Sequence, residues 1–376
     1  MTASMSWAGA TARRLREHAL AGPPAPTPAD VAVRLCGAHA QVMSAAEVSV
    51  AIRLDGATRS TVRAALSEDR SLVKTYGPRG TVHLLAADDL PMWTGALSAV
   101  PSRSPFPEGV RLTPAQATQV VEAIADSLAD RDLTLDELND EVVRRAGAWA
   151  GERVMPAFQE LWPRWRQVIT QAAHRGVLAF GPSAGRTVTY TNPRVKPWPA
   201  TRALATLVRH YLAGYGPATP QQFAQWLGAP PAWAAELFAS MAADLIPVDF
   251  EGGRAWVAEA AVAEEPPAGV RLLPYFDAYL IGSHPRAKLY PGPAATRALS
   301  PTGQAGNFPV VLVDGVVAGV WHQKRSGRTI AVAVELLGRS TVSLRRRVEA
   351  EAERVAHILE GAAKVTFGPV TVGGHA

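Results

Sequence analysis

The sequence has a single cysteine, Cys36, and no long apolar run. One cysteine cannot form a disulfide within the chain or supply a metal site of several thiolates. No stretch of roughly 18 apolar residues is uninterrupted, and no apolar segment follows the arginines near the N-terminus, so neither a membrane span nor a secretion signal is expected. We therefore expect a cytoplasmic protein.

The standard catalytic motifs are also missing. The sequence contains no Walker loop, no G-x-S-x-G elbow and no H-E-x-x-H pair. Most of the nine histidines, such as His18, His210 and His357, lie in helical patterns that are typical of structural or surface positions. The sequence therefore predicts neither metal nor nucleotide catalysis, and no cofactor is expected.

Basic residues outnumber acidic ones by 38 to 33, which gives a formal net charge of +5. A basic protein attracts polyanions such as nucleic acid, although the arginine excess is equally consistent with a GC-rich genome. Hydrophobic residues make up 48% of the 376 positions and charged residues 19%. This composition predicts a globular protein of about two to four structural units.

Helix starts are well marked, because a Ser or Thr hydroxyl can accept from the free amides of the first turn and Pro is tolerated at the first helical position. Such starts occur at Thr27-Pro28, Thr113-Pro114 and Thr219-Pro220. Four capping boxes are expected, at Ser44 with Glu47, Thr113 with Gln116, Thr134 with Glu137, and Thr219 with Gln222.

One supersecondary unit is predicted three times: helix, tight turn, helix and hairpin, the plan of a winged helix-turn-helix module. The expected hairpins lie within residues 72–85, 177–190 (turning at 181–186) and 246–257. After about residue 269 the pattern becomes strand-rich, with hairpin turns at Asp314-Gly315 and Ser326-Gly327. The predicted fold is α+β: three tandem modules in residues 1–100, 101–196 and 197–265, and a C-terminal β-rich domain in residues 266–376.

The three predicted modules differ in the charge of their second helix. In the first module this helix carries Arg59 and Arg63, and in the second module it carries Arg166 and Arg175. In the third module it has no basic residue. Winged helices also bind proteins, but these charges favour duplex DNA as the partner of the first two modules, with the third as scaffold. Two basic hairpins are further candidates for DNA contact. One carries Lys74 and Arg79, and the other carries Lys324, Arg325 and Arg328. Such hairpin tips can also be solvated turns without a partner.

The run His39-Ala40-Gln41 lies between an apolar segment and the expected helix start at Ser44. In a short loop, its two polar side chains can point the same way. From the residues alone, a plain polar loop between helices is the simpler interpretation.

Several separate stretches, taken together, resemble the AlkZ-like DNA glycosylases of the winged-helix superfamily. They are Gly37-Ala-His-Ala-Gln41, Arg79-Gly-Thr-Val-His83, Gly176-Val-Leu with Gly181-Pro, Leu272-Leu-Pro-Tyr-Phe-Asp-Ala-Tyr-Leu280, and Pro309-Val-Val-Leu-Val-Asp-Gly315. The resemblance implies a C-shaped arrangement of the modules around duplex DNA, and removal of bulky or cross-linking alkyl adducts, typically N7-alkylpurines. It also implies that some members confer self-resistance on antibiotic producers.

The family's catalytic motif, commonly Gln-x-Gln or Gln-x-Asp, matches His39 and Gln41 in this sequence. The histidine departs from the common pattern and resembles the branch associated with trioxacarcin-type antibiotics, which implies large adducts at guanine N7. We expect His39 to accept a proton from the attacking water while Gln41 orients it, with activity lost below about pH 6. No lysine lies near His39 in sequence, so no lyase step is expected.

The sequence thus predicts a monomeric, monofunctional DNA glycosylase that acts on duplex DNA carrying alkylated guanine. Two alternatives remain open. A winged-helix transcriptional regulator would bind an undamaged palindrome as a dimer. A sequestration protein would bind adducted DNA or the drug without releasing a base.

Overall fold

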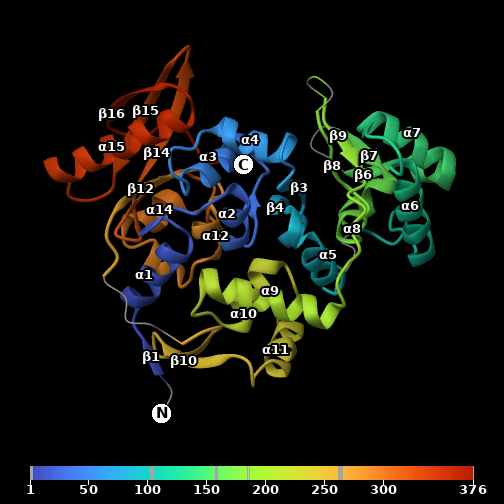
Figure 1. Cartoon of the computed structure of the whole chain (residues 1–376), viewed down its shortest axis with the longest axis horizontal. Coiled ribbons are helices and arrows are strands. Elements are labelled where there is room, and N and C mark those ends of the chain that lie inside the picture. The colour runs from blue at the N-terminus through green and yellow to red at the C-terminus, as the bar shows by residue number, and fades with distance from the viewer. Residues whose placement is uncertain are drawn as a thin grey trace.

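The computed structural model describes residues 3–101, 106–156, 160–183, 185, 187–260 and 266–375. The chain has a mixed α+β architecture, as the sequence predicts, in which helices alternate with several small sheets (Figure 1). Two residues of the expected turn at 181–186, Ala184 and Arg186, lie outside the described residues.

The first unit, residues 7–98, contains the predicted pair of helices and hairpin. Its three strands form a sheet in the order β2-β4-β3, so the hairpin β3–β4 gains a short third strand. In chain order its elements are α1 (Trp7–Glu17), α2 (Pro28–Arg34), β2 (Ala38–His39), α3 (Met43–Ala51), α4 (Arg59–Ser67), β3 (Leu72–Tyr76), η1 (Pro78–Gly80), β4 (Val82–Ala86), η2 (Ala87–Asp89) and α5 (Leu90–Ser98).

The second unit, residues 114–191, repeats the order of helices and hairpin with shorter strands. Thr113 and Thr134 cap its first two helices through the expected boxes with Gln116 and Glu137. Its elements are α6 (Pro114–Ser127), β5 (Leu133–Thr134), α7 (Leu135–Ala146), η3 (Ala148–Gly151), β6 (Arg153–Pro156), β7 (Leu161–Pro163), η4 (Arg164–Val168), α8 (Ile169–His174), β8 (Ala179–Phe180) and β9 (Thr189–Thr191).

The third unit, residues 200–257, follows the same order, and the box of Thr219 with Gln222 is confirmed. Its hairpin gains a parallel third strand from the N-terminus, β1, whose pairing partners lie more than 200 positions away and leave no local signal. The elements are α9 (Ala200–Tyr215), α10 (Pro220–Leu227), α11 (Pro231–Ser240), β10 (Ile246–Phe250) and β11 (Gly253–Val257), together with β1 (Ala3–Met5).

The C-terminal unit, residues 270–367, is built on a five-stranded sheet in the order β12-β13-β14-β15-β16. The predicted Asp314-Gly315 and Ser326-Gly327 turns join its central antiparallel strands, and β16 adds parallel to β15. Its elements are β12 (Val270–Leu273), α12 (Ala278–Gly282), α13 (Arg286–Leu289), α14 (Pro293–Ala298), β13 (Val310–Val313), β14 (Val316–Ser326), β15 (Thr329–Leu336), α15 (Val342–Ile358) and β16 (Ala362–Phe367).

The apolar cores show which units are packed together. One core runs from the first unit into the C-terminal unit, so Leu35 and Val50 belong to the same cluster as Leu272. A second core joins α5 to the third unit, whereas the second unit packs around its own buried Trp165. In Figure 1 the C-terminal and second units accordingly stand on opposite sides of the first unit, with the third unit below.

One predicted capping box is wrong. Helix α3 begins at Met43, one residue before Ser44, and its cap residue Val42 makes no side-chain hydrogen bond. The Glu47 carboxylate instead accepts two hydrogen bonds from Arg63 on the next helix, at 2.6 and 3.1 Å. A charge-assisted, two-point contact with Arg is stronger than a cap to a backbone amide, which explains the choice.

Candidate active site

Of the expected catalytic pair, His39 ends strand β2 at the edge of the first sheet, and Gln41 lies in the bend that follows. Strand β2 pairs antiparallel with β4, so that His39 lies opposite His83, and the Ala40 amide continues the ladder by donating to the Val82 carbonyl at 2.7 Å. Successive side chains of a strand point to opposite faces. Ala38 and Ala40 are accordingly buried, whereas His39 is half-buried and Gln41 exposed. This alternation explains why one apolar residue, Ala40, separates the two polar residues His39 and Gln41.

Two residues in left-handed conformations turn the chain from α2 into this strand. Cys36 has a φ of 49° and Gly37 a φ of 89°. A Cβ added to Gly37 would lie 2.8 Å from Leu85 Cδ2 and 3.3 Å from His83 Cδ2. Only glycine therefore combines this backbone angle with so close an approach to β4.

The His39 ring lies between two aromatic rings. The His83 ring is 5.2 Å away, centroid to centroid, in a T-shaped contact, and the Phe276 ring of the C-terminal unit is 4.8 Å away. Burial and, to a smaller extent, the nearby Arg79 charge lower the pKa of His39 to about 4. The imidazole is therefore neutral at neutral pH.

The Nδ1 atom of His39 is buried and has no hydrogen-bond partner. A proton on Nδ1 would be a buried, unpaired donor, which costs about 1–3 kcal/mol. The neutral ring is therefore better satisfied with its proton on Nε2. In that tautomer His39 presents a donor, not a proton acceptor, through Nε2.

The pH dependence expected from the sequence needs correction. Loss of activity below about pH 6 assumed an ordinary imidazole, whereas burial moves the pKa of His39 to about 4. Protonation of His39 itself should leave the rate flat between about pH 5 and 8.

Acid should instead weaken the fold. Burial lowers the pKa of His18 and His284 to about 3 and that of His174 to about 4. The unfolded chain takes up protons on these imidazoles near pH 6.5, so their stabilising contribution is complete above that pH and is lost as the pH falls towards 3–4. We expect the thermal midpoint to drop steeply between about pH 6 and 5. A midpoint that stays constant over this range would contradict the prediction.

The Phe276 backbone is anchored by the neighbouring Asp277. This carboxylate is completely buried and accepts hydrogen bonds from Arg53 Nη1 and Nη2 at 2.9 and 2.8 Å and from Ser49 Oγ at 2.7 Å. It also accepts from the Tyr279 amide at the start of α12. Ser49 on α3 and Arg53 just beyond that helix therefore tie the first unit to the loop that carries Phe276.

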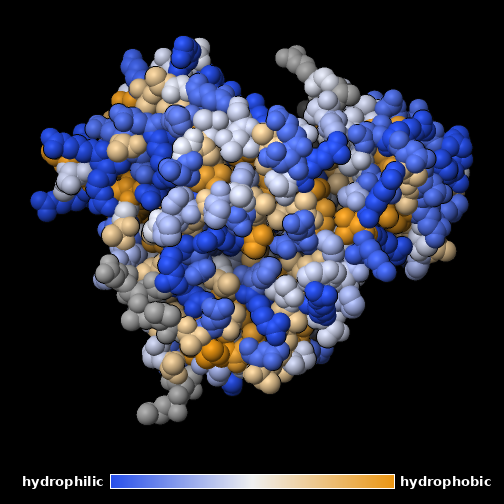
Figure 2. Space-filling view, in the orientation of Figure 1, coloured by the Kyte–Doolittle hydropathy of each residue, from blue (hydrophilic) through white to orange (hydrophobic). Residues whose placement is uncertain are grey.

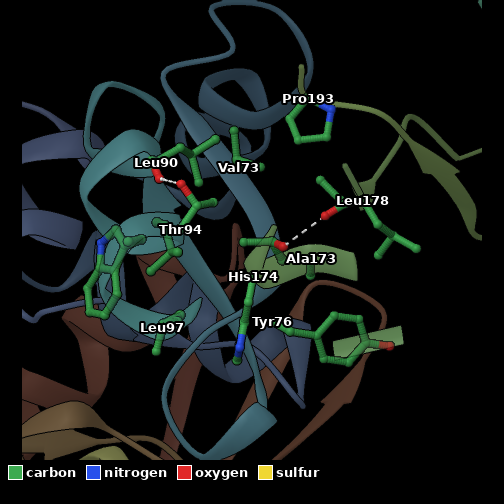
Figure 3. A pocket seen from close by; sticks show the side chains of 13 residues that line it. Val73, Tyr76, Leu90, Thr94, Leu97, Ala173, His174, Leu178 and Pro193 are labelled. Carbon is green, nitrogen blue, oxygen red and sulfur yellow. Dashed lines mark hydrogen bonds between the residues drawn. The ribbon is translucent and has the colours of Figure 1, made fainter. Parts of the chain in front are cut away.

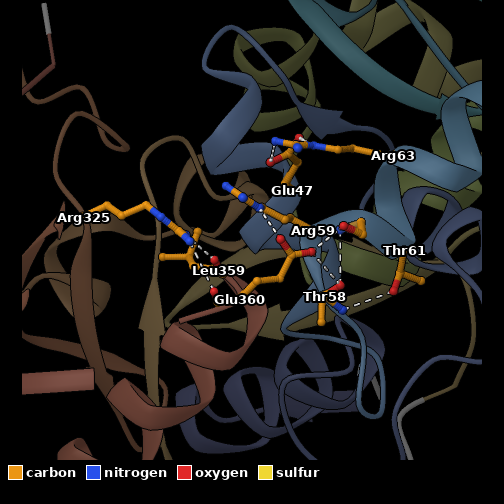
Figure 4. Close-up of polar contacts among 9 residues, drawn as sticks. Glu47, Thr58, Arg59, Thr61, Arg63, Arg325, Leu359 and Glu360 are labelled. Carbon is orange, nitrogen blue, oxygen red and sulfur yellow. Dashed lines mark hydrogen bonds and ion pairs between the residues drawn. The ribbon is translucent and has the colours of Figure 1, made fainter. Parts of the chain in front are cut away.

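Two of the expected DNA-contacting arginines form ion pairs within the protein (Figure 4). Arg63 binds the buried Glu47 carboxylate with two nitrogens. Arg59 donates through Nε to Glu360 at 3.0 Å, and the Thr58 and Ser60 hydroxyls donate to the other oxygen of the same carboxylate. These donors lower the pKa of Glu360 to about 2. The start of α4 is thus an anion-binding corner, occupied by a carboxylate from the end of α15.

The basic residues of the first hairpin also make contacts within the protein. Arg79 at its tip has a φ of 60° and donates to the Trp226 carbonyl of α10, so it links the hairpin to the third unit. The Lys74 ammonium lies 4.6 Å from the centroid of the Phe180 ring, and burial lowers its pKa. The structure therefore gives both side chains contacts between units.

The remaining candidates lie on the second and C-terminal units. The Arg166 guanidinium stacks 3.7 Å from the centroid of the Trp162 ring, with its Nε buried and unpaired. Arg325 donates to the Leu359 and Glu360 carbonyls at 2.6 and 3.3 Å. Arg325 is exposed, as are Arg175, Lys324 and Arg328, for whose side chains no partner is found in the described part of the chain.

A small cavity lies between the first and second units, where α5 and β3 meet α8 and β8 (Figure 3). Apolar side chains such as Trp93 and Leu178 dominate its lining, and His174 reaches it with a buried, unpaired Nε2. Neither His39 nor Gln41 is among the lining residues. The expected catalytic pair therefore belongs to a different part of the surface.

The outer surface is strongly hydrophilic over the C-terminal unit and the second unit, and the outline of the molecule is indented between these two units (Figure 2). Within the described residues, no group of three or more His, Cys, Asp or Glu is placed to hold a metal ion. No helix in that part of the chain is long and apolar enough to cross a membrane.

The family model described as DNA glycosylase AlkZ-like matches residues 32–358, a span that contains the expected catalytic pair and every expected DNA-contacting residue. The chain belongs to the AlkZ-like DNA glycosylase family. The interstrand DNA cross-link repair glycosylase of Streptomyces sahachiroi is 34% identical over 336 residues, which cover 84% of this chain and 88% of that protein. The solved structure of S. sahachiroi DNA glycosylase AlkZ superposes with a TM-score of 0.82 and 30% identity, over 97% of this chain and 100% of that one.

The prediction that this protein is a DNA glycosylase is therefore confirmed. Sequence reasoning missed the partners that surround the site: His83, Phe276 and the Arg53–Asp277 pair. A usable signal was present for one of them, because an aspartate within the apolar run 272–280 must be paired when that run is buried. Nothing in the sequence indicated that Glu360 would bind Arg59.

Proposed function

We propose that this AlkZ-like glycosylase hydrolyses the N-glycosidic bond of bulky N7-alkylguanine adducts in duplex DNA, with His39 and Gln41 as its catalytic residues. One observation carries the assignment of the site: Ala40 is buried, whereas His39 is half-buried and Gln41 exposed, an alternation that favours both polar side chains on the same side of the segment. Two polar side chains on one side of a strand can hold a single water between them.

The chemistry of the leaving group explains why so little catalytic machinery is needed. Alkylation at N7 makes the purine cationic, so it departs without a strong acid. The sugar cation that remains reacts readily with a correctly placed water. In our proposal the water accepts a hydrogen bond from Nε2–H of His39 and donates one to the carboxamide oxygen of Gln41. Once its oxygen has bonded to the sugar cation, it releases its extra proton to bulk solvent, so positioning takes the place of proton abstraction by the enzyme.

The proposal includes DNA binding by three tandem winged helix-turn-helix modules in a C-shaped, monomeric chain. The repeated order of helices and hairpin and the indented outline support it (Figures 1 and 2). Exposed Arg175, Lys324 and Arg328 are the cations best placed to reach phosphates without first leaving a partner. Lys74 and Arg166, which lie against aromatic rings, remain available as donors.

The test is base release from defined duplexes. The protein is incubated with DNA carrying N7-methylguanine, a bulky N7-guanine adduct of the trioxacarcin type, or no adduct, and abasic sites are revealed with alkali. We expect cleavage of both adducted duplexes and none of the normal one, because an unactivated glycosidic bond needs more help. Binding of adducted DNA without base release would instead identify a sequestration protein, and selective binding of an undamaged palindrome a regulator.

An interstrand cross-linked duplex belongs in the same test, because the curated relative is named for repairing such cross-links. A nitrogen-mustard cross-link between guanine N7 atoms has the same cationic leaving group on each strand. We therefore expect the protein to unhook it. Borohydride should trap no covalent enzyme–DNA adduct, since the proposed reaction uses water and not an amine.

The same proposal assigns the protein a role in base excision repair and antibiotic self-resistance. Expression in an alkylation-sensitive bacterium should raise survival against a DNA-alkylating antibiotic. A variant with His39→Ala, which still binds DNA, should not.

Removal of the Glu360 charge should strengthen DNA binding. Glu360 now satisfies Arg59 and the hydroxyls of Thr58 and Ser60, which are groups that bind phosphate equally well. Glu360→Gln should therefore lower the Kd for an undamaged duplex about threefold to tenfold and steepen its salt dependence by about one ion. Glu353→Gln, on the helix α15 that precedes Glu360, is the matched control. An unchanged Kd in both variants would contradict a phosphate contact at Arg59.

A further inference from the structure

The ring of His39 contacts aromatic side chains from two units of the protein. One is His83, from β4 of the first unit, and the other is Phe276, from the loop before α12. His83 is itself fixed, because its Nδ1 lies 2.9 Å from the Thr81 carbonyl and a Cβ on Gly77 would approach that nitrogen to 2.8 Å. The His83 side of the contact therefore has little freedom to move.

The Phe276 side is fixed by its backbone. Phe276 has a φ of 55°, in the left-handed region that side chains other than glycine rarely adopt. Its amide donates to the Gly306 carbonyl at 2.8 Å, and a Cβ on Gly306 would lie 3.2 Å from the Phe276 Cα. The buried Asp277 anchors the next position. Such a conformation persists only where the surroundings fix it, and residues of this kind concentrate at functional sites.

We propose that Phe276 is a positioning residue, contributed by the C-terminal unit, which holds the His39 ring so that Nε2 faces the substrate and Nδ1 stays away from water. The proposal rests on the catalytic role proposed for His39. It explains why an aromatic ring occupies a conformation suited to glycine. It also gives the C-terminal unit a direct part in catalysis.

Loss of the Phe276 ring should leave a specific mark on the pH profile. The titratable groups that face His39 are His83 from β4, Arg79 from η1 and, beyond Phe276, His375 near the C-terminus. Burial is the largest cause of the low pKa of His39. When Phe276 is truncated, water reaches Nδ1 and the pKa of His39 moves towards its ordinary value. Below that pKa the imidazolium keeps its Nε2–H, but its positive charge faces the cationic base and sugar and so slows bond cleavage.

The test compares Phe276→Ala and Phe276→Leu with Phe250→Ala, a matched loss of a stacked ring in the third unit. Single-turnover rates on N7-methylguanine duplex are measured from about pH 5 to 8, together with the Kd for the same DNA. We expect Phe276→Ala to lower the rate about tenfold or more at pH 7, with Kd changed less than about threefold, and to bring an acid limb into the range of about pH 5–6.5. Phe276→Leu, which keeps most of the volume, should lie between Phe276→Ala and the wild type.

Two outcomes would overturn the inference: an unchanged rate and pH profile in Phe276→Ala, or an equal loss of rate in Phe250→Ala. If Phe276→Ala does not fold, the same criteria apply to Phe276→Leu. An active His39→Ala variant would count against the catalytic role of His39 itself. That result is distinguishable, because it would appear without any change at Phe276.

Discussion

Replacement of His39 or Gln41 by alanine should lower the single-turnover rate of base release by about 100-fold or more, with little change in the Kd for adducted DNA. In the proposed mechanism each alanine removes one of the two groups that hold the water, while the DNA contacts stay in place. Substitution by His39→Gln should retain the rate within about tenfold of the wild type, because a carboxamide can hold a water but cannot take up a proton near neutral pH. The loss of rate in the two alanine variants is the largest effect on activity that we expect.

The control is His210→Gln, a half-buried histidine on α9 that lies outside the catalytic run. It should leave the rate unchanged. If His39→Gln is as inactive as His39→Ala, proton abstraction by the imidazole is needed and the water-holding mechanism is wrong. If all three variants of the pair are fully active, the catalytic site lies elsewhere.

Replacement of Asp277 by alanine should reduce the free energy of unfolding by about 3–5 kcal/mol. The substitution leaves the guanidinium of Arg53 buried without its counter-charge and removes the acceptor for the Ser49 hydroxyl. Arg53 and Asp277 are 1% and 0% exposed, so water cannot replace the lost partner. The thermal midpoint should fall sharply, and activity should fall with it because Phe276 loses its anchor.

Asp244→Ala is the matched control, since Asp244 pairs with Arg209 at the same N–O distance of 2.8 Å but at the surface. Its cost should be about 0–1 kcal/mol. A combined replacement of Arg53 by Met and Asp277 by Leu should recover much of the stability, because no unpaired charge remains in the core. Equal destabilisation by the two aspartate variants would contradict the assignment of the ion pair as a structural link.

Local features of the sequence predicted most elements correctly. The boxes at Thr113, Thr134 and Thr219 and the turn at Asp314-Gly315 all occur where expected. Each depends on contacts between residues two to four positions apart, which a sequence displays directly. The predicted box at Ser44 is wrong because Glu47 instead accepts hydrogen bonds from Arg63, which lies 16 positions away in the sequence.

The same distinction between local sequence and distant contacts applies to the candidate active site. The sequence by itself determined the His39-Ala40-Gln41 spacing, and the resemblance of the surrounding stretches to a known family made that run the expected catalytic pair. The tertiary structure alone decided what surrounds the pair: His83 and Phe276 beside the imidazole, a pKa near 4, and the Arg53–Asp277 tie that secures them. It also decided that Arg59 and Arg63 meet carboxylates within the chain. Burial and charge pairing are properties of distant segments brought together, so they become fixed only when the units pack.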